Sequence, residues 1–119
     1  MPSPDPPLIA IVDDEPSVRV ALGRLCRAHG LSAREFASAQ ELVASLTERR
    51  PDCVVLDLQL PNCDGLDADV WLRQQGVDLP IIIITGRDDA KTSSESVVLR
   101  KPVDASTLFA AIGNALKSR

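Results

Sequence analysis

"LIAIVDDEPSVRVALGRLC", residues 8–26, decides the fold, because a continuous apolar run gives way within a few residues to a helical pattern. A short run that is apolar at every position is typical of a strand buried on both faces of a parallel sheet. From Pro16 onward the apolar residues recur at helical spacing, and proline is favoured in the first turn of a helix. The stretch therefore predicts a strand followed by a helix, with Asp13 and Asp14 where the two join.

The same order of strand and helix repeats along the rest of the chain. Short apolar runs predict further strands, the first of them weaker than the others, and a capping signal, Ser38-x-x-Glu41, marks a helix start. Expected strands cover residues 31–36, 53–57, 80–85 and 97–99, and expected helices begin at Pro16 and Ser38 and cover 64–76 and 104–119. Parallel neighbours need long right-handed crossovers, so this order predicts one α/β domain whose parallel sheet is covered on both faces.

Length and composition fit a single globular domain. The 119 residues can close one core, and with 45% hydrophobic and 25% charged residues wholesale disorder is not expected. The net charge of −4 gives no electrostatic reason to bind nucleic acid or an anionic membrane. No apolar run approaches the roughly 20 residues of a membrane span and no signal peptide is evident, so we expect a cytoplasmic protein. We divide the chain into a flexible proline-rich N-terminus, residues 1–7, and one domain over residues 8–119.

Polar residues follow the predicted strands at the point where each strand ends. The first strand runs into Asp13 and Asp14, and later strands end in Asp57, end in Thr85 and lead into Lys101. Because the carboxyl ends of parallel strands share one edge of a sheet, where ligands bind, we expect these side chains to converge. Three neighbouring carboxylates would raise one another's pKa, and a Mg²⁺ ion would offset that repulsion while a lysine and a hydroxyl face a phosphate. The set predicts transfer of a phosphoryl group to a carboxylate, with Asp57 as the nucleophile.

Each of these motifs alone also has a purely structural interpretation. An Asp-Asp pair after a strand is often a loop start or a helix N-cap, and Thr85-Gly86 alone would be a turn. The functional interpretation depends on all of them arriving in order at successive strand ends.

Four segments carry a family resemblance: "VDDE" at 12–15, "VVLDLQLPNCDG" at 54–65, "IIITG" at 82–86 and "RKP" at 100–102. They resemble the receiver domains of two-component response regulators, the CheY-like superfamily, and the resemblance covers essentially the whole chain after the proline-rich start. It implies a flavodoxin-like (βα)5 three-layer sandwich with a five-stranded parallel sheet in the order 2-1-3-4-5. It also implies a cis peptide bond between Lys101 and Pro102.

The resemblance implies a role for each residue at the strand ends. Asp57 would be the phosphoacceptor, Thr85 would hydrogen-bond the phosphoryl group and Lys101 would pair with it. Mg²⁺ would be the cofactor, and its ligands would be Asp13, Asp14, Asp57 and the main-chain carbonyl of Gln59. The phosphoryl group would come from a sensor histidine kinase or a phosphotransfer protein. The domain would catalyse only its own phosphorylation and dephosphorylation, so it would not be an enzyme acting on other substrates.

The connection between the last two strands is shorter than receiver domains usually have. Its residues 86–95, "GRDDAKTSSE", sit at the lower limit of the roughly 10 to 12 residues that a helical crossover needs, and Ala90 is their only aliphatic residue. We therefore expect the fourth crossover helix to be absent or reduced to a turn and the segment to be mobile. That loss would bare aliphatic surface, which predicts a homodimer or partner interface on strands 80–85 and 97–99 and the last helix, unless neighbouring helices shift to cover it.

The usual switch of receiver domains depends on an aromatic residue three positions before the lysine, and here that position is Val98. We expect a different switch, in which phosphorylation orders the segment that begins at Gly86 by drawing Thr85 toward the phosphoryl group. Arg87 and Gln59 lie where side chains could tune attack by water on the phosphoryl group, and both could equally be surface residues.

Other functions remain open at this point. A degenerate receiver would serve as a phosphorylation-independent interaction module, and the shortened connection leaves room for that interpretation. An aspartyl-phosphate hydrolase would need a second carboxylate two residues after Asp57, and Gln59 occupies that position. Chain length does not decide between a stand-alone receiver and a piece of a longer regulator.

Overall fold

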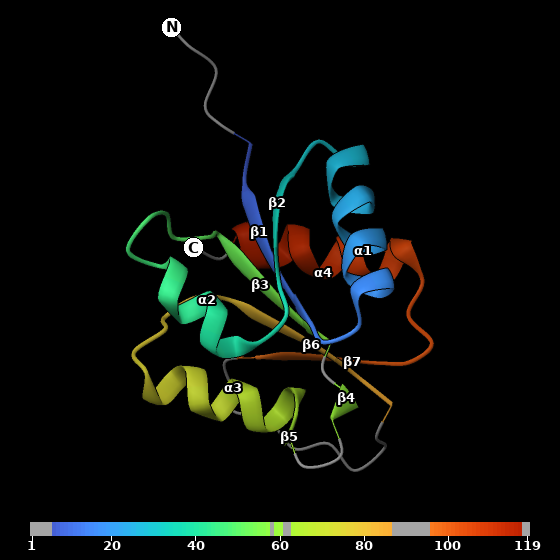
Figure 1. Ribbon diagram of the computed structural model, residues 1–119. Coiled ribbons are helices and arrows are strands. Elements are labelled where there is room, and N and C mark those ends of the chain that lie inside the picture. The colour runs from blue at the N-terminus through green and yellow to red at the C-terminus, as the bar shows by residue number, and fades with distance from the viewer. Residues whose placement is uncertain (1–5, 58, 61–62, 87–95, 118–119) are drawn as a thin grey trace, which may run out of the picture.

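The computed structural model describes residues 6–57, 59–60, 63–86 and 96–117, with the backbone alone for residues 59–60 and 63–67. Its centre is a sheet of five parallel strands in the order β2-β1-β3-β6-β7 (Figure 1). The strands are β1 (Leu8–Asp13), β2 (Ser32–Phe36), β3 (Cys53–Asp57), β6 (Ile81–Thr85) and β7 (Val97–Arg100). Counted within this sheet alone the order is 2-1-3-4-5, which confirms the predicted topology.

Helices cover both faces of the sheet and make three layers (Figure 1). The helices are α1 (Pro16–Ala28) and α4 (Ala105–Lys117) on one face, and α2 (Ala39–Ser45) and α3 (Gly65–Gln74) on the other. The alternation of side chains along a strand separates two cores, so that Ile11 of β1 faces α1 and α4 whereas Val12 faces α2 and α3. The predicted flavodoxin-like sandwich is confirmed.

The continuous apolar runs form the buried strands, as predicted. Every residue of β1, β3 and β6 is buried. The strands at the two edges of the sheet, β2 and β7, are only partly buried. A strand in the middle of a sheet with helices on both faces has no solvent side, which explains why its sequence does not alternate.

Local signals mark where the helices begin and end. Pro16 is the first residue of α1, and the Ser38 hydroxyl accepts a hydrogen bond from the backbone N–H of Glu41 at 3.2 Å. The Glu41 carboxylate accepts in turn from the backbone N–H of Ala37 at 2.7 Å, one residue earlier than in the standard capping box. Gly76, with a φ of +82°, adopts the left-handed conformation that favours glycine just beyond α3.

A small antiparallel pair of strands is not among the predicted elements. β4 (Gln59–Leu60) pairs with β5 (Cys63–Asp64) between β3 and α3. Strands of two residues are too short to show a period in the sequence, which is why the pattern misses them. The pair lies directly beyond Asp57 and so borders the edge of the sheet where the polar residues were expected to meet.

Some predictions fall on parts of the chain that the structure does not describe. The reduced fourth crossover helix and its mobility concern residues 87–95, and the flexible N-terminus concerns mainly residues 1–5. Description of the chain resumes at Ser96, immediately before β7. Within the described ranges, no helix combines the length and the apolar character needed to cross a membrane.

Candidate functional site

The polar residues expected at the strand ends meet at one edge of the sheet. Asp13 and Asp57 are partners in register at the ends of β1 and β3. Thr85 is the last residue of β6, and its carbonyl accepts a hydrogen bond from the backbone N–H of Lys101 at 2.8 Å. The half-buried Asp14 follows Asp13 directly. These residues converge because parallel pairing places every carboxyl end on the same side of the sheet.

Asp57 and Lys101 form an ion pair at this edge. Lys101 Nζ lies 2.9 Å from Asp57 Oδ1, and the Asp57 side chain is 6% exposed against 33% for that of Lys101. A lysine ammonium is a point charge on a flexible stem and binds phosphate oxygens as readily as carboxylate oxygens. The lysine is therefore within reach of a group attached to Asp57.

A cavity of about 680 Å³ lies over this ion pair. Asp57 and Lys101 line it together with Gly86. Apolar side chains of α1 form one wall, and residues 102–105 with Leu108 form another part of the lining. A group in this cavity would contact both members of the ion pair and the apolar side of α1.

Asp13 is the most deeply buried carboxylate of the site. Its Oδ1 accepts a hydrogen bond from the backbone N–H of Glu15 at 2.8 Å, and among the described residues its Oδ2 has no hydrogen-bond partner. The pKa of Asp13 is raised to about 6, mainly by burial; the negative charges of Asp57 and Asp14 add to the rise, and the Glu15 hydrogen bond and Lys101 oppose it. The expected repulsion between neighbouring carboxylates is thus present in the fold.

The donor set fits a hard cation that keeps part of its water shell. Within the described residues, no three acidic, histidine or cysteine side chains stand close enough to enclose a metal ion. Mg²⁺ does not need such a cage, because it binds through one or two carboxylates and retains several waters. A buried Asp13 oxygen without a hydrogen bond, with the charges of Asp14 and Asp57 acting on it, is where a cation would lower the electrostatic cost. Gln59, the expected carbonyl ligand, is the first residue of β4 just beyond Asp57.

Arg19 belongs to the site, although its place there is not predicted from the sequence. It lies on α1, and its Nη1 donates a hydrogen bond to the main-chain carbonyl of Asp13 at 2.7 Å. Its backbone N–H donates to the carbonyl of Glu15 at 3.0 Å, which is the first hydrogen bond of the helix, so the side-chain contact ties the start of α1 to the end of β1. The only signal in the sequence is a basic residue near the start of the helix that follows two aspartates.

Of the three residues expected to act in the switch, the structure describes Val98 and Gly86 but not Arg87. Val98 is half-buried in β7 and packs against the core formed with α2 and α3, so an aliphatic side chain occupies the expected aromatic position. Gly86 is exposed just after β6 and lines the cavity over the ion pair. Arg87 lies outside the described residues, so its tuning role stays a prediction. The peptide bond between Lys101 and Pro102 is cis, as expected.

The sequence of this chain is similar to known response regulator sequences. A family described as "Response regulator receiver domain" matches residues 9–113. The response regulator MprA of Mycolicibacterium vanbaalenii is 40% identical over 83 residues, covering 70% of this chain and 36% of that protein. The response regulator protein TodT of Pseudomonas putida is 33% identical over 116 residues, covering 92% of this chain and 51% of that protein. The chain therefore spans between about a third and about a half of the length of these curated relatives.

Solved structures show the same fold over nearly the whole chain. The crystal structure of FixJ-N has a TM-score of 0.78 at 26% identity and covers 95% of this chain and 95% of that chain. The signal receiver domain of an HD domain-containing protein from Pseudomonas fluorescens Pf-5 has a TM-score of 0.80 at 25% identity, covering 99% of this chain and 92% of that chain. With its parallel sheet and the acidic edge that pairs Asp57 with Lys101, the chain belongs to the response regulator receiver domains, the signalling modules of two-component systems.

Proposed function

We propose that this receiver domain is phosphorylated on Asp57 by a sensor histidine kinase or a phosphotransfer protein in a Mg²⁺-dependent reaction. The observation that carries the proposal is the 2.9 Å contact between Lys101 Nζ and Asp57 Oδ1, next to the buried carboxylate of Asp13. The contact places the positively charged ammonium group of Lys101 against the Asp57 carboxylate, which lines an open cavity. Membership of the receiver family supports the same role.

The proposed step moves one phosphoryl group onto a carboxylate oxygen. An Oδ atom of Asp57 attacks phosphorus, the O–P bond forms as the P–N bond of a phosphohistidine breaks, and the leaving imidazole keeps the electron pair and takes up a proton. Lys101 pairs with one phosphoryl oxygen and the Thr85 hydroxyl donates a hydrogen bond to another. Bound Mg²⁺ would supply further positive charge for these oxygens. The residues that would hold it are Asp13, Asp14, Asp57 and, through its carbonyl, Gln59.

The domain would act on itself rather than on other substrates. Loss of the phosphoryl group would proceed by attack of water on the aspartyl phosphate, at a rate tuned by the side chains at positions 59 and 87. We place the domain in the cytoplasm. We assign it no contact with nucleic acid, because a protein with a net charge of −4 is repelled by polyanions.

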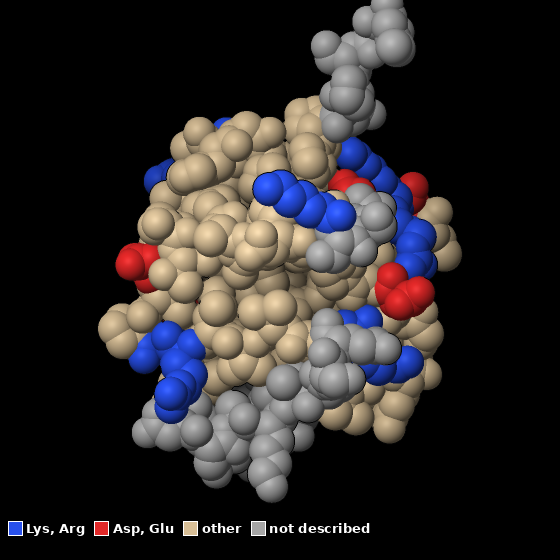
Figure 2. Space-filling model, turned by 180° about the vertical axis from the view of Figure 1, so that it is seen from behind, with Lys and Arg blue, Asp and Glu red and all other residues tan. Residues whose placement is uncertain are grey.

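We further propose a homodimer through the face formed by α4 and the edge strand β7. The aliphatic side chains of β6, which were expected to be bared, are buried and add no exposed surface to this face. Lys117 is the one charged residue among the 13 of α4, and Val97 of β7 is 44% exposed. A groove of about 890 Å³ is lined by α4, the start of β6 and Val97, and also by the charged residues Arg50, Arg73 and Asp78. The view from behind, in which α4 lies on the near side, shows a broad uncharged surface with Lys and Arg mostly toward its margin (Figure 2). Exposed apolar surface often marks an association site, and Val97 supplies such surface beside α4.

Intact mass after incubation with Mg²⁺ and acetyl phosphate tests the phosphoacceptor proposal. We expect one added phosphoryl group on the wild type, none on Asp57→Ala, and none on the wild type in excess EDTA. Asp78→Ala is the matched control, because Asp78 is an exposed aspartate near the amino end of β6, away from the candidate site. This variant should take up one phosphoryl group, like the wild type. A folded wild-type protein that takes up no phosphoryl group would instead favour a phosphorylation-independent interaction module.

A further inference from the structure

A second polar cluster lies away from the acidic site, where β7 begins. It consists of Asp69 and Arg73 of α3 and of Ser96, the residue immediately before β7, and is called here the Asp69–Arg73–Ser96 cluster. We propose that this cluster anchors the start of β7 to α3 and thereby positions Lys101 for phosphoryl transfer. The inference rests on the proposed function, since Lys101 is the residue expected to pair with the phosphoryl group.

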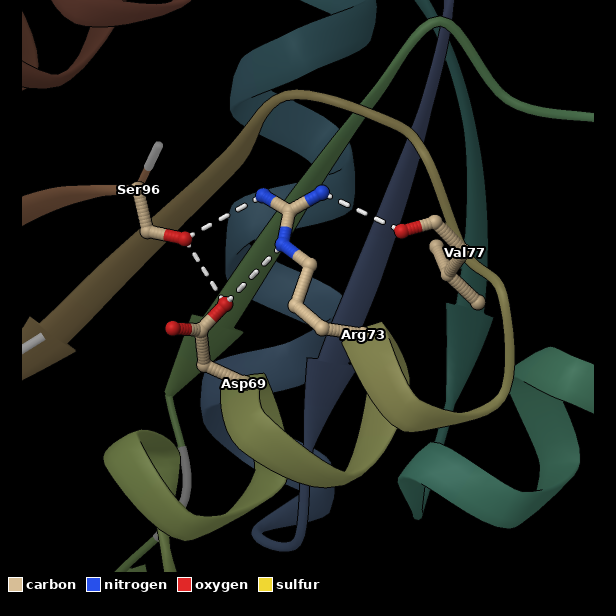
Figure 3. Close-up of polar contacts among 4 residues, drawn as sticks. All are labelled: Asp69, Arg73, Val77 and Ser96. Carbon is tan, nitrogen blue, oxygen red and sulfur yellow. Dashed lines mark hydrogen bonds and ion pairs between the residues drawn. The ribbon is translucent and has the colours of Figure 1, made fainter. Parts of the chain in front are cut away.

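The three side chains form a closed ring of contacts (Figure 3). The Ser96 hydroxyl donates a hydrogen bond to Asp69 Oδ1 at 2.7 Å and accepts one from Arg73 Nη2 at 3.2 Å. Arg73 Nε lies 3.6 Å from the same Asp69 oxygen, and Arg73 Nη1 donates to the carbonyl of Val77 at 3.1 Å. One hydroxyl therefore bridges a carboxylate and a guanidinium that lie one helical turn apart on α3.

Burial makes the position of the Ser96 hydroxyl important. Asp69 is fully buried, and the Arg73 side chain is 18% exposed. Removing a hydrogen bond from a buried charge is costly, and hydrogen bonds to charged groups are stronger than those between neutral groups. Both charged groups therefore favour the one placement of Ser96 in which its hydroxyl reaches them, and this holds the backbone at the start of β7.

β7 depends on an anchor because it is a short edge strand. It has four residues, none of them fully buried, and in the described sheet it pairs with β6 alone. At its other end the backbone N–H of Lys101 donates to the Thr85 carbonyl. The cluster and this hydrogen bond thus hold the two ends of β7.

The cluster also joins the helix that follows Asp57 in the chain to the strand that leads into Lys101. α3 follows the β4–β5 pair, which itself follows Asp57, and β7 leads into Lys101. An extended chain from Ser96 to Lys101 spans only about 16 Å at about 3.3 Å per residue. Because the strand between them is so short, we expect a displacement of Ser96 to shift the backbone up to Lys101. The contact between Lys101 Nζ and Asp57 Oδ1 would then change, and a misplacement of about 1 Å can slow a reaction by about 100-fold.

The test compares Ser96→Ala with Ser96→Thr, which keeps a hydroxyl, and with Ser45→Ala as the matched control. Ser45 is a buried serine whose hydroxyl donates to the Leu42 carbonyl within α2. Two quantities are measured on the full chain: hydrogen exchange of the β7 amides, and the initial rate of phosphorylation by saturating acetyl phosphate with Mg²⁺. We expect Ser96→Ala to exchange its β7 amides about tenfold faster and to be phosphorylated about tenfold more slowly, with Ser96→Thr and Ser45→Ala close to the wild type.

A role limited to overall stability would give a different pattern. Ser96→Ala would then speed exchange throughout the sheet, as any destabilised variant does, and its folded molecules would be phosphorylated at the wild-type rate; that result would overturn the proposal. If the wild type itself took up no phosphoryl group, the proposed function would fail, and β7 exchange would still test the anchor. Unchanged β7 exchange in Ser96→Ala would overturn the anchor, and faster exchange confined to β7 would support it.

Discussion

At the scale of single residues, Asp13 shows the electrostatic cost of burying a carboxylate in the site. Its pKa is raised from 3.8 to about 6, first by burial and further by the charges of Asp57 and Asp14. A raised pKa means that the folded chain binds this proton more tightly than the unfolded chain does. Without metal, the contribution of Asp13 to stability is therefore complete below about pH 4 and is lost as the pH rises through about 6.

Asp13→Asn should remove this buried negative charge, and with it the repulsion from Asp57 and Asp14, while keeping an oxygen that accepts from the Glu15 N–H. In the absence of metal we expect the variant to melt a few degrees above the wild type at pH 7, with the difference vanishing near pH 4. Added Mg²⁺ should raise the melting temperature of the wild type and leave that of Asp13→Asn almost unchanged. Thermal melting followed by circular dichroism measures both effects. Asp78→Asn serves as the control, and a variant less stable than the wild type at pH 7 would contradict this account.

Lys101 has two opposed effects at Asp57. Its ammonium would stabilise a phosphoryl group, but at 2.9 Å from Asp57 Oδ1 it also repels a metal ion that shares the carboxylate. Lys101→Met should therefore slow phosphorylation by about 100-fold or more while it tightens Mg²⁺ binding. Intact-mass kinetics and calorimetric titration of Mg²⁺ measure the two quantities. Lys117→Met, at the end of α4, should change neither, and weaker Mg²⁺ binding by Lys101→Met would show that the electrostatic argument is wrong.

At the scale of elements, short helices and edge strands depend on the residues at their ends. α2 has only seven residues, so little of its stability comes from its own propagation as a helix. Its first turn is held by two hydrogen bonds: the Ser38 hydroxyl accepts from the Glu41 N–H, and the Glu41 carboxylate accepts from the Ala37 N–H. β7 depends in the same way on Ser96 at its start and on the hydrogen bond of Lys101 at its end.

Ser38→Ala should lower the free energy of unfolding by about 1 kcal/mol, because the backbone N–H of Glu41 loses its partner. Phosphorylation of the folded protein should be unaffected, since α2 contributes no residue to the candidate site. Urea unfolding gives the stability and intact-mass kinetics gives the rate. The matched control is Ser106→Ala, an exposed serine near the start of α4, which should change stability by less than about 0.5 kcal/mol. Equal effects of the two substitutions would mean that the cap does not stabilise α2.

At the scale of the whole molecule, the two helical layers differ in what they leave exposed. The layer with α4, a helix whose one charged residue is Lys117, exposes a broad uncharged surface bordered by charged side chains (Figure 2). Sedimentation of Val97→Lys tests the proposed homodimer, because the substitution replaces an exposed apolar side chain of the groove by a further charge beside Arg50, Arg73 and Asp78. We expect the wild type to dimerise with rising concentration, Val97→Lys to stay monomeric, and Val70→Lys, on the 52% exposed Val70 of α3, to behave like the wild type. A wild type that stays monomeric with and without phosphorylation would exclude this interface.

Most of the fold could be predicted because its signals are local. Apolar runs marked β1, β3 and β6, and the Ser38 cap marked the start of α2. The β4–β5 pair escaped prediction because two-residue strands carry no period. Arg19 escaped because a single arginine on a helix looks like a solvent-facing residue until the helix is docked against the end of β1.

The sequence by itself determined the order of the helices and of the strands of the five-stranded sheet. It also determined that Asp13, Asp57, Thr85 and Lys101 meet, because parallel strands bring their carboxyl ends to one edge whatever the details of packing. Only the tertiary structure decided which polar side chains meet elsewhere. Asp69 stands in a helical pattern as an ordinary polar residue, yet it is fully buried and bonded to Ser96, 27 residues further along the chain. That contact depends on how α3 packs beside β7, and no local period in the sequence encodes the relative placement of two elements so far apart.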